Sequence, residues 1–361
     1  MDLLLIFIIT FLITAIITPV VIKLANRFDL VDNPSRRPHP AHIQERIVPR
    51  AGGLAIFVGM IAAFLLFLPL EKHLWGIILG MSVLLTLGLI DDKKLHFSPY
   101  WRLLGQILAA TVVVLSGVGI SFITNPLGGI IRLDTIILGF DFWGTHKIIL
   151  IADLLALVWI VWVMNMINWS KGVDGQMPGI VLVTLTTLGL LSLKLFSQGD
   201  PQQLNIAKLS FIGAGAALGM LVFNWHPAKI FPGFSGSTIF GFLIAVIAIL
   251  SGGKLATAGL VLLVPATDFV YTFFRRILQG HSPVWADRGH LHHHLLNLKL
   301  SHQQIALFYM IGGVILGTVA LNLNSTQKLF TAVGLGTIIL GGILWLNLFG
   351  GLSEHSDPDN G

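Results

Sequence analysis

The chain contains no cysteine and few charged residues. Among its 361 residues, 11% are charged and 55% are hydrophobic. Soluble globular domains have roughly a quarter charged residues, so this composition excludes that class. The absence of cysteine excludes disulfide bonds, thiolate catalysis and cysteine-ligated metals. The net charge of +5 is interpreted as a topology signal of a membrane protein, not as a sign of nucleic-acid binding.

Long apolar runs dominate the chain, and runs of roughly 17 to 25 residues are typical of transmembrane helices. They predict an all-α, polytopic protein with about eleven spans, a single integral membrane domain over 1–350 and a short polar tail over 351–361. The first run lacks a basic n-region and a cleavage site, so we expect a retained anchor. The candidate spans are 3–22, 51–70, 74–90, 103–121, 148–164, 178–196, 207–223, 237–251, 255–273, 304–322 and 329–349.

Most Lys and Arg residues lie in the loops that follow the odd-numbered spans. The positive-inside rule places those loops in the cytoplasm. We therefore expect a multi-pass protein of the cytoplasmic membrane, with its N-terminus outside and its C-terminus inside. On the outer side, the "NPLGG" turn within 122–147 lies among β-branched residues and predicts a small external hairpin.

The polar motifs all fall on the predicted cytoplasmic side. The first loop reads "DNPSRRPHPAHIQERIVPRAGG", in which Arg36, Arg37, His39 and Arg50 are candidate phosphate ligands. A solvated basic loop is the alternative.

The third span ends in "LGLIDDKKLHFSPYWRLLGQ". Adjacent carboxylates repel each other, so placing Asp91 and Asp92 at a membrane edge costs energy unless a cation offsets them. Mg²⁺ is the natural candidate because it prefers oxygen ligands. Helix capping by a solvated pair is the alternative.

The stretch "NMINWSKGVDGQ" follows a very apolar run. Asn165 and Asn168 are three residues apart, so one helical face can carry both. Lys171 and Asp174 follow, and "DG" is a turn signal. An ordinary helix end and turn needs only one Asn and one Gly, so the extra polar residues favour a functional interpretation.

Two further loops carry polar residues. "FNWHPAKIFPGFSGST" contains Asn224 and predicts a loop with a tight turn. "RRILQGHSPVWADRGHLHHHLL" places Arg288 before His290, His292 and His293. Such a cluster can bind zinc, can donate hydrogen bonds to an anion, or can be a solvated loop.

Asp268 lies inside the ninth predicted span. A carboxylate within a membrane-spanning segment is costly, so it is a functional candidate by default.

In this order, the motifs resemble those of the polyprenyl-phosphate N-acetylhexosamine-1-phosphate transferases of glycosyltransferase family 4, integral membrane enzymes that begin cell-wall and surface-glycan synthesis. The matching stretches are "RRPH…VPRAGG", "LGLIDD…HFSPYWRLLGQ", "NxxNxxxGxDG", "FNWxPAxxFxGxSGS" and "RRxLxGxSPxxxDRGHLHHxL". They span about residues 30 to 300. The last motif resembles the branch that uses UDP-N-acetylglucosamine.

The resemblance implies transfer of a sugar-1-phosphate from a UDP-amino sugar to undecaprenyl phosphate at the cytoplasmic face, with release of UMP. Mg²⁺ is the implied cofactor, the lipid bilayer is the setting, and a homodimer is left open. The pathway, whether peptidoglycan, lipopolysaccharide or teichoic acid, is also left open. The implied catalytic residues are Asp91, Asp92, His290, His292 and His293, and the implied metal ligands are Asp91, Asp92 and Asp174. The expected substrate-binding residues are Asn165, Asn168, Lys171, Asp174, Asn224, Arg288, Arg37, His39 and Arg50.

The chain departs from the family motifs at two positions. Lys171 and Phe234 stand where "NxxNxxDGxDG" and "FxGDxGS" have aspartates. Three alternatives follow: the remaining carboxylates hold Mg²⁺ more weakly, Lys171 partly replaces the metal, or the chain is a non-catalytic homologue that binds the lipid phosphate or nucleotide sugar. A transporter is disfavoured because no internal repeat is found and the polar groups gather on one face.

Overall fold

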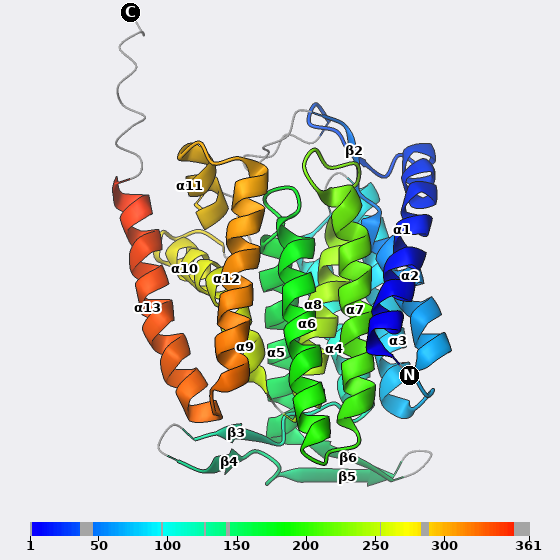
Figure 1. The fold of residues 1–361 in the computed structure, drawn as a ribbon, viewed down its shortest axis with the longest axis vertical. Coiled ribbons are helices and arrows are strands. Elements are labelled where there is room, and N and C mark those ends of the chain that lie inside the picture. The colour runs from blue at the N-terminus through cyan, green and yellow to red at the C-terminus, as the bar shows by residue number, and fades with distance from the viewer. Residues whose placement is uncertain are drawn as a thin grey trace, which may run out of the picture.

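A computed structural model describes residues 2–36, 46–94, 97–125, 128–141, 145–252, 254–282 and 289–349. Three of the expected substrate-binding residues, Arg37, His39 and Arg288, lie outside this described part. Helices make up most of it and run largely side by side in one bundle (Figure 1). The predicted all-α membrane fold is therefore confirmed.

Eight helices of the described part are long and apolar enough to cross a membrane. They are α1 (Leu3–Arg27), α3 (Lys72–Lys93), α5 (Leu150–Trp169), α6 (Gln176–Ser197), α7 (Gln203–Asn224), α8 (Gly233–Leu250), α12 (His302–Asn322) and α13 (Ser325–Phe349). Two apolar helices are shorter, α2 (Gly52–Phe67) with 16 residues and α4 (Pro99–Leu115) with 17. The expected count of eleven spans is therefore not confirmed.

The ninth predicted span is broken into two helices. α9 (Leu255–Val261) and α10 (Leu263–Leu278) meet at an angle of 85°. Pro265 lies in the first turn of α10 and has no N–H to donate to the carbonyl of Val261, four residues earlier, which favours a break between the two helices. Counted as one bent span, the pair brings the described total to nine.

Three small antiparallel hairpins complete the described part. β3 (Phe122–Thr124) pairs with β4 (Ile130–Arg132) across the "NPLGG" stretch, which confirms the predicted hairpin. Two pairs were not predicted: β5 (Ile137–Asp141) with β6 (Thr145–Ile149), and β1 (Val31–Asp32) with β2 (Val48–Pro49). The β1–β2 pair brings the described parts of the first polar loop back to the bundle.

The hairpins β3–β4 and β5–β6 lie at one end of the bundle, together with the N-terminus (Figure 1). The β1–β2 pair and the short helix α11 (Leu291–Asn297) lie at the opposite end. The polar motifs between the helices therefore gather at one end, which we call the motif end. That this end faces the cytoplasm stays a prediction, as does the homodimer.

Small residues set the closest helix contacts. α1 packs along α7, where Gly215 and Gly219 face the α1 residues Thr10 and Thr14. A Cβ atom at Gly215 would lie 2.5 Å from the carbonyl oxygen of Phe7, so only glycine allows this approach. Small residues at such interfaces let membrane helices gain van der Waals contact and replace the hydrophobic driving force that lipid does not supply.

We expect Gly215→Leu to lower the apparent melting temperature of the purified protein in detergent, because overpacking a tight contact costs about 1–3 kcal/mol or more. Gly341→Leu on α13 is the matched control, since a Cβ atom at Gly341 meets nothing within 4 Å. Equal melting temperatures for the two variants would contradict the α1–α7 packing described here.

Candidate functional site

The site is built around Asp92, whose side chain is 0% exposed at the end of α3. Its Oδ1 accepts a hydrogen bond from the Phe234 amide at 2.9 Å, and its Oδ2 accepts one from the Ser235 hydroxyl at 2.9 Å. Arg50 Nε lies 3.5 Å from Oδ1. The stretch "FPGFSGS", predicted to be a loop, thus contributes the first turn of α8, and the partial positive charge of a helix N-terminus stabilises the carboxylate there.

Gly233 makes this approach possible. Its φ is +72°, in the left-handed region that favours glycine. A Cβ atom at this position would collide with Asp92 Oδ2 and with the carbonyl oxygen of Arg50. The backbone before α8 is also tied to the first polar loop, since the Phe231 amide donates to the Pro49 carbonyl at 2.7 Å.

Asp91 is held by a different cation. Arg102 Nε on α4 donates to Asp91 Oδ1 at 2.6 Å, and the Asp91 side chain is 2% exposed. The Arg102 guanidinium also lies over the Phe234 ring, 5.5 Å from its centroid, a distance suited to a cation–π contact. The phenylalanine that replaces the family aspartate therefore supports the cation that binds Asp91.

Lys171 reaches the same place from the loop between α5 and α6. Its Nζ donates to the Gly233 carbonyl at 3.4 Å. The pKa of Lys171 is lowered to about 8, chiefly by burial and also by the nearby Arg50 and Arg102, while Asp92 and Asp91 oppose this shift. The ammonium is therefore mostly protonated at pH 7. We call Arg50, Asp91, Asp92, Arg102 and Lys171 the paired-aspartate cluster.

The two asparagines of α5 point to different partners. Asn168 Oδ1 accepts from the Ser237 hydroxyl at 2.8 Å, beside the paired-aspartate cluster. Asn165 Nδ2 donates to Gln106 Oε1 on α4 at 2.8 Å. Both contacts tie helices together, and Gln106 is a partner that the sequence did not identify.

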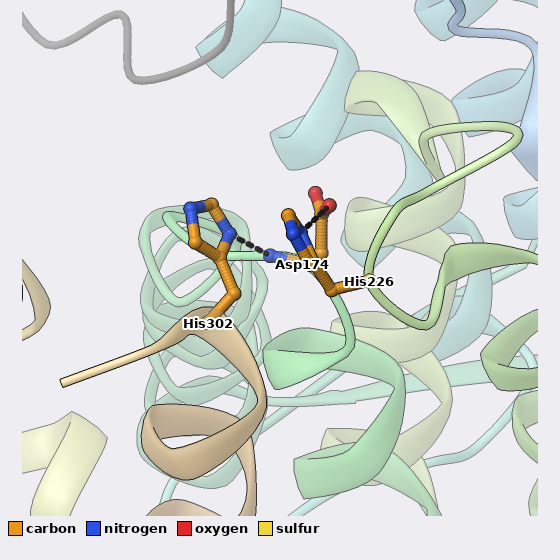
Figure 2. Close-up of side chains that lie close together, drawn as sticks. All are labelled: Asp174, His226 and His302. Atoms are coloured by element: carbon orange, nitrogen blue, oxygen red, sulfur yellow. Dashed lines mark hydrogen bonds and ion pairs between the residues drawn. The ribbon is translucent and has the colours of Figure 1, made fainter.

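Asp174 lies in a separate group (Figure 2). Its Oδ2 accepts from the Ala228 amide at 3.0 Å and from His226 Nδ1 at 2.8 Å, while its own amide donates to His302 Nδ1 at 3.3 Å. The rings of His226 and His302 are 4.5 Å apart. Sequence reasoning missed His302, whose only local feature is its place just after the Ser301 N-cap of α12.

The expected metal set of Asp91, Asp92 and Asp174 is not assembled. Within the described ranges, the group with all candidate ligand atoms within 4.8 Å of one another is Asp174, His226 and His302. Asp174 is held in that group because its carboxylate accepts hydrogen bonds from His226 and the Ala228 amide, which lie just after α7.

Asn224 acts as a clamp between two loops. Its Oδ1 accepts from the Gly175 amide and its Nδ2 donates to the Ile230 carbonyl, both at 3.0 Å. It therefore fixes the loop that carries Lys171 and Asp174 against the segment that leads into α8.

His290 forms a third polar group, with Asp268. His290 Nδ1 donates to Asp268 Oδ2 at 2.9 Å, and the Leu291 amide donates to Asp268 Oδ1 at 2.8 Å. The other ring nitrogen, Nε2, lies 3.4 Å from Arg276 Nη2, and that guanidinium lies over the Trp169 ring at 4.6 Å. The carboxylate thus fixes the orientation and tautomer of His290.

His292 links this group to the Lys171 loop. Its ring packs so closely on Gly172 that a Cβ atom there would collide with it. The ring is nearly parallel to that of His290, with centroids 5.4 Å apart, and the His293 ring is 4.4 Å away. Burial lowers the pKa of His292 well below its ordinary value, so the ring is neutral at pH 7. In the described part, these histidines do not form a three-ligand group, and the zinc alternative for this motif stays a prediction.

The donors present do not fit the Mg²⁺ that the resemblance implies. A magnesium site presents carboxylate oxygens to the ion. Here the Asp92 oxygens already accept hydrogen bonds from Phe234 and Ser235 and form an ion pair with Arg50, and Asp91 binds Arg102. The Lys171 ammonium adds a further positive charge beside the pair.

We expect the stability cost of Lys171 to depend on pH. Its pKa falls from 10.5 to about 8 on folding, so between these values the unfolded chain holds a proton that the folded chain has lost. The free energy of unfolding therefore rises with pH across this window. Lys171→Met removes this contribution, so its gain in melting temperature over the wild type should be largest below pH 8 and shrink toward pH 10.5.

The exposed Lys229, mutated to Met, is the matched control for the loss of a lysine. A Lys171→Met gain that stays constant over this range would contradict the assigned burial of the ammonium.

Comparisons with known proteins agree with the resemblance of the motifs. The profile described as glycosyl transferase family 4 matches residues 74–252. The chain is 32% identical over 350 residues to a probable undecaprenyl-phosphate N-acetylglucosaminyl 1-phosphate transferase of Bacillus subtilis (strain 168), covering 95% of this chain and 86% of that protein. It is 33% identical over 351 residues to a decaprenyl-phosphate N-acetylglucosaminephosphotransferase of Mycobacterium leprae, covering 89% and 83%. An undecaprenyl-phosphate alpha-N-acetylglucosaminyl 1-phosphate transferase of Escherichia coli K12 is 25% identical over 308 residues, covering 82% and 77%.

Proposed function

Because the chain belongs to glycosyl transferase family 4, we propose that it transfers N-acetylglucosamine-1-phosphate from UDP-N-acetylglucosamine to a polyprenyl phosphate such as undecaprenyl phosphate. An oxygen of the lipid phosphate attacks the β-phosphorus of the nucleotide sugar. A new P–O bond forms, the P–O bond between the β-phosphorus and the bridging oxygen breaks, and UMP leaves with its electron pair. The relatives' names support both the sugar and the class of lipid.

The observation that carries this proposal is an apolar groove beside the His290 group. Its volume is about 830 Å³. Side chains of α5, α10 and α13 line it, including Trp162, Leu263, Ala266, Val270, Phe274 and Leu344. Arg275 also lines the groove, and its Nη1 donates to the Gly289 carbonyl at 3.2 Å, one residue before His290.

A polyprenyl phosphate is a long apolar chain with one charged end, and the groove offers matching chemistry. Its apolar residues suit the isoprenoid chain. In the last turn of α10, Arg275 lines the groove and Arg276 contacts the buried His290, so positive charge lies between the two. The lipid phosphate would thus lie beside His290, whose ring Asp268 already orients.

The remaining polar groups suit the nucleotide sugar. Phosphoryl transfer asks a protein for positioning and charge neutralisation more than for covalent chemistry. Lys171 and Asp174 lie on one loop, so a donor that reaches both would place its diphosphate at the paired-aspartate cluster and its nucleoside toward His226 and His302. UDP-sugars are cytoplasmic substrates in this scheme, so the motif end would face the cytoplasm.

The direct test is UMP release from UDP-N-acetylglucosamine by purified protein with undecaprenyl phosphate, with the Bacillus subtilis relative as the active control. We expect release by the wild type. Asp268→Asn should lower the rate by about 10²-fold, because an amide at this position no longer fixes the orientation of the His290 ring beside the lipid phosphate. The matched control is Asp134→Asn, the same change in an Asp134–Arg132 pair at the hairpin end.

No release with any UDP-amino sugar, while the relative is active, would favour the non-catalytic homologue. An equal loss of the UMP-release rate in Asp134→Asn and Asp268→Asn would contradict the role assigned to the Asp268–His290 pair.

The groove makes a second prediction. Ala332→Trp on α13 should raise the KM for undecaprenyl phosphate by about tenfold or more with a smaller change in kcat, because filling the groove removes binding that the ground state and transition state share. Ile338→Trp is the matched control on the same helix, since Ile338 is 70% exposed and does not line the groove. Equal effects of the two variants would contradict this placement of the lipid.

A further inference from the structure

The paired-aspartate cluster is already balanced by the protein's own cations. Facing the pair are Arg50 from the segment before α2, Arg102 from α4 and Lys171 from the α5–α6 loop. Arg50 also contacts a third carboxylate, Asp32 on β1, at 3.4 Å. In the described part, the three cations of the cluster are therefore matched by its two carboxylates together with Asp32.

A divalent ion would disturb this balance. Two unit charges 4 Å apart interact by about 4 kcal/mol at the effective dielectric of a protein surface. A divalent ion doubles its repulsion from each cation as well as its attraction to each carboxylate, so beside carboxylates already paired with cations it gains little net attraction. At Asp92, the ion would share the carboxylate oxygens with the Phe234 amide, the Ser235 hydroxyl and the Arg50 guanidinium, and at Asp91 it would compete with Arg102 at 2.6 Å. Phe234 also supplies an aromatic ring, which cannot ligate Mg²⁺.

Lys171 is placed to receive an anion. An ammonium has three N–H donors, and the Gly233 carbonyl accepts one at a long 3.4 Å. The side chain is half-buried at the motif end, on the same loop as Asp174. Lysine serves elsewhere as a point charge for phosphates.

We propose that this site binds the diphosphate of its nucleotide substrate without a divalent cation, with the Lys171 ammonium at the centre and Arg50 supporting it. The inference rests on the proposed function for the identity of the ligand. The charge balance itself does not depend on that function. The transfer step balances without a metal, because the lipid phosphate supplies the nucleophilic oxygen and UMP leaves with the electron pair of the broken P–O bond.

The first experiment measures Mn²⁺ binding by electron paramagnetic resonance, using wild-type protein without nucleotide. The comparison is the double variant Lys171→Asp with Phe234→Asp, which restores two carboxylates. We expect the wild type to bind Mn²⁺ at least about tenfold more weakly than the double variant. Lys171→Asp alone is the second variant, for use if the double variant does not fold. Its affinity for Mn²⁺ is also expected to exceed that of the wild type.

The second experiment measures UDP and UMP binding by calorimetry in the presence of a chelator. We expect the wild type to bind UDP. Lys171→Met should lower the affinity for UDP by about tenfold and change the affinity for UMP by less than about twofold, because UMP lacks the β-phosphate. Lys229→Met, an exposed lysine, is the matched control.

The outcomes separate the inference from the function it rests on. Stoichiometric Mn²⁺ binding by the wild type that is lost in Asp91→Asn and kept in His302→Ala would overturn the inference, whether or not the chain is an active transferase, because it would place the ion at the aspartate pair and not at the Asp174, His226 and His302 group. UDP binding that requires Mg²⁺, or that Lys171→Met does not weaken, would also overturn it. Failure to bind UDP with or without Mg²⁺ would overturn the proposed function and with it the assigned ligand.

Discussion

The buried carboxylate of Asp92 at the first turn of α8 is the contact on which the site depends. The Phe234 amide and the Ser235 hydroxyl hold it in place, and this joins the end of α3 to the start of α8. Arg50 follows because the first polar loop pairs with the backbone before α8, and Lys171 reaches the Gly233 carbonyl from the other side. Without donors on both oxygens, a charge buried at a membrane edge would cost several kcal/mol.

The second requirement is that the groove proposed for the lipid lies next to the site proposed for the nucleotide sugar. The groove along α10 and α13 belongs to the apolar part of the bundle, while the paired-aspartate cluster belongs to the motif end. The histidine helix α11 connects them, because His290 binds Asp268 on α10 and His292 packs on Gly172 beside Lys171. A shift of α10 would therefore move the α5–α6 loop, and a shift of that loop would move α10.

Much of this arrangement could be predicted from the sequence. Hydropathy predicts the helices, and the placement of the polar motifs between them predicts that they gather at one end. Three features could not be predicted in the same way: the break between Val261 and Leu263, the helical start at Gly233, and the grouping of Asp174 with His226 and His302. Each depends on contacts between segments far apart in the chain, and a proline or an "SGS" turn is compatible with several local structures.

The balance between carboxylates and cations is tested most directly by a crystal structure with UDP and Mn²⁺, using the anomalous scattering of manganese. This account predicts the β-phosphate within hydrogen-bonding distance of Lys171 Nζ and no manganese peak at Asp91 or Asp92. A manganese ion bound by either aspartate, with Lys171 turned away from the phosphate, would contradict it.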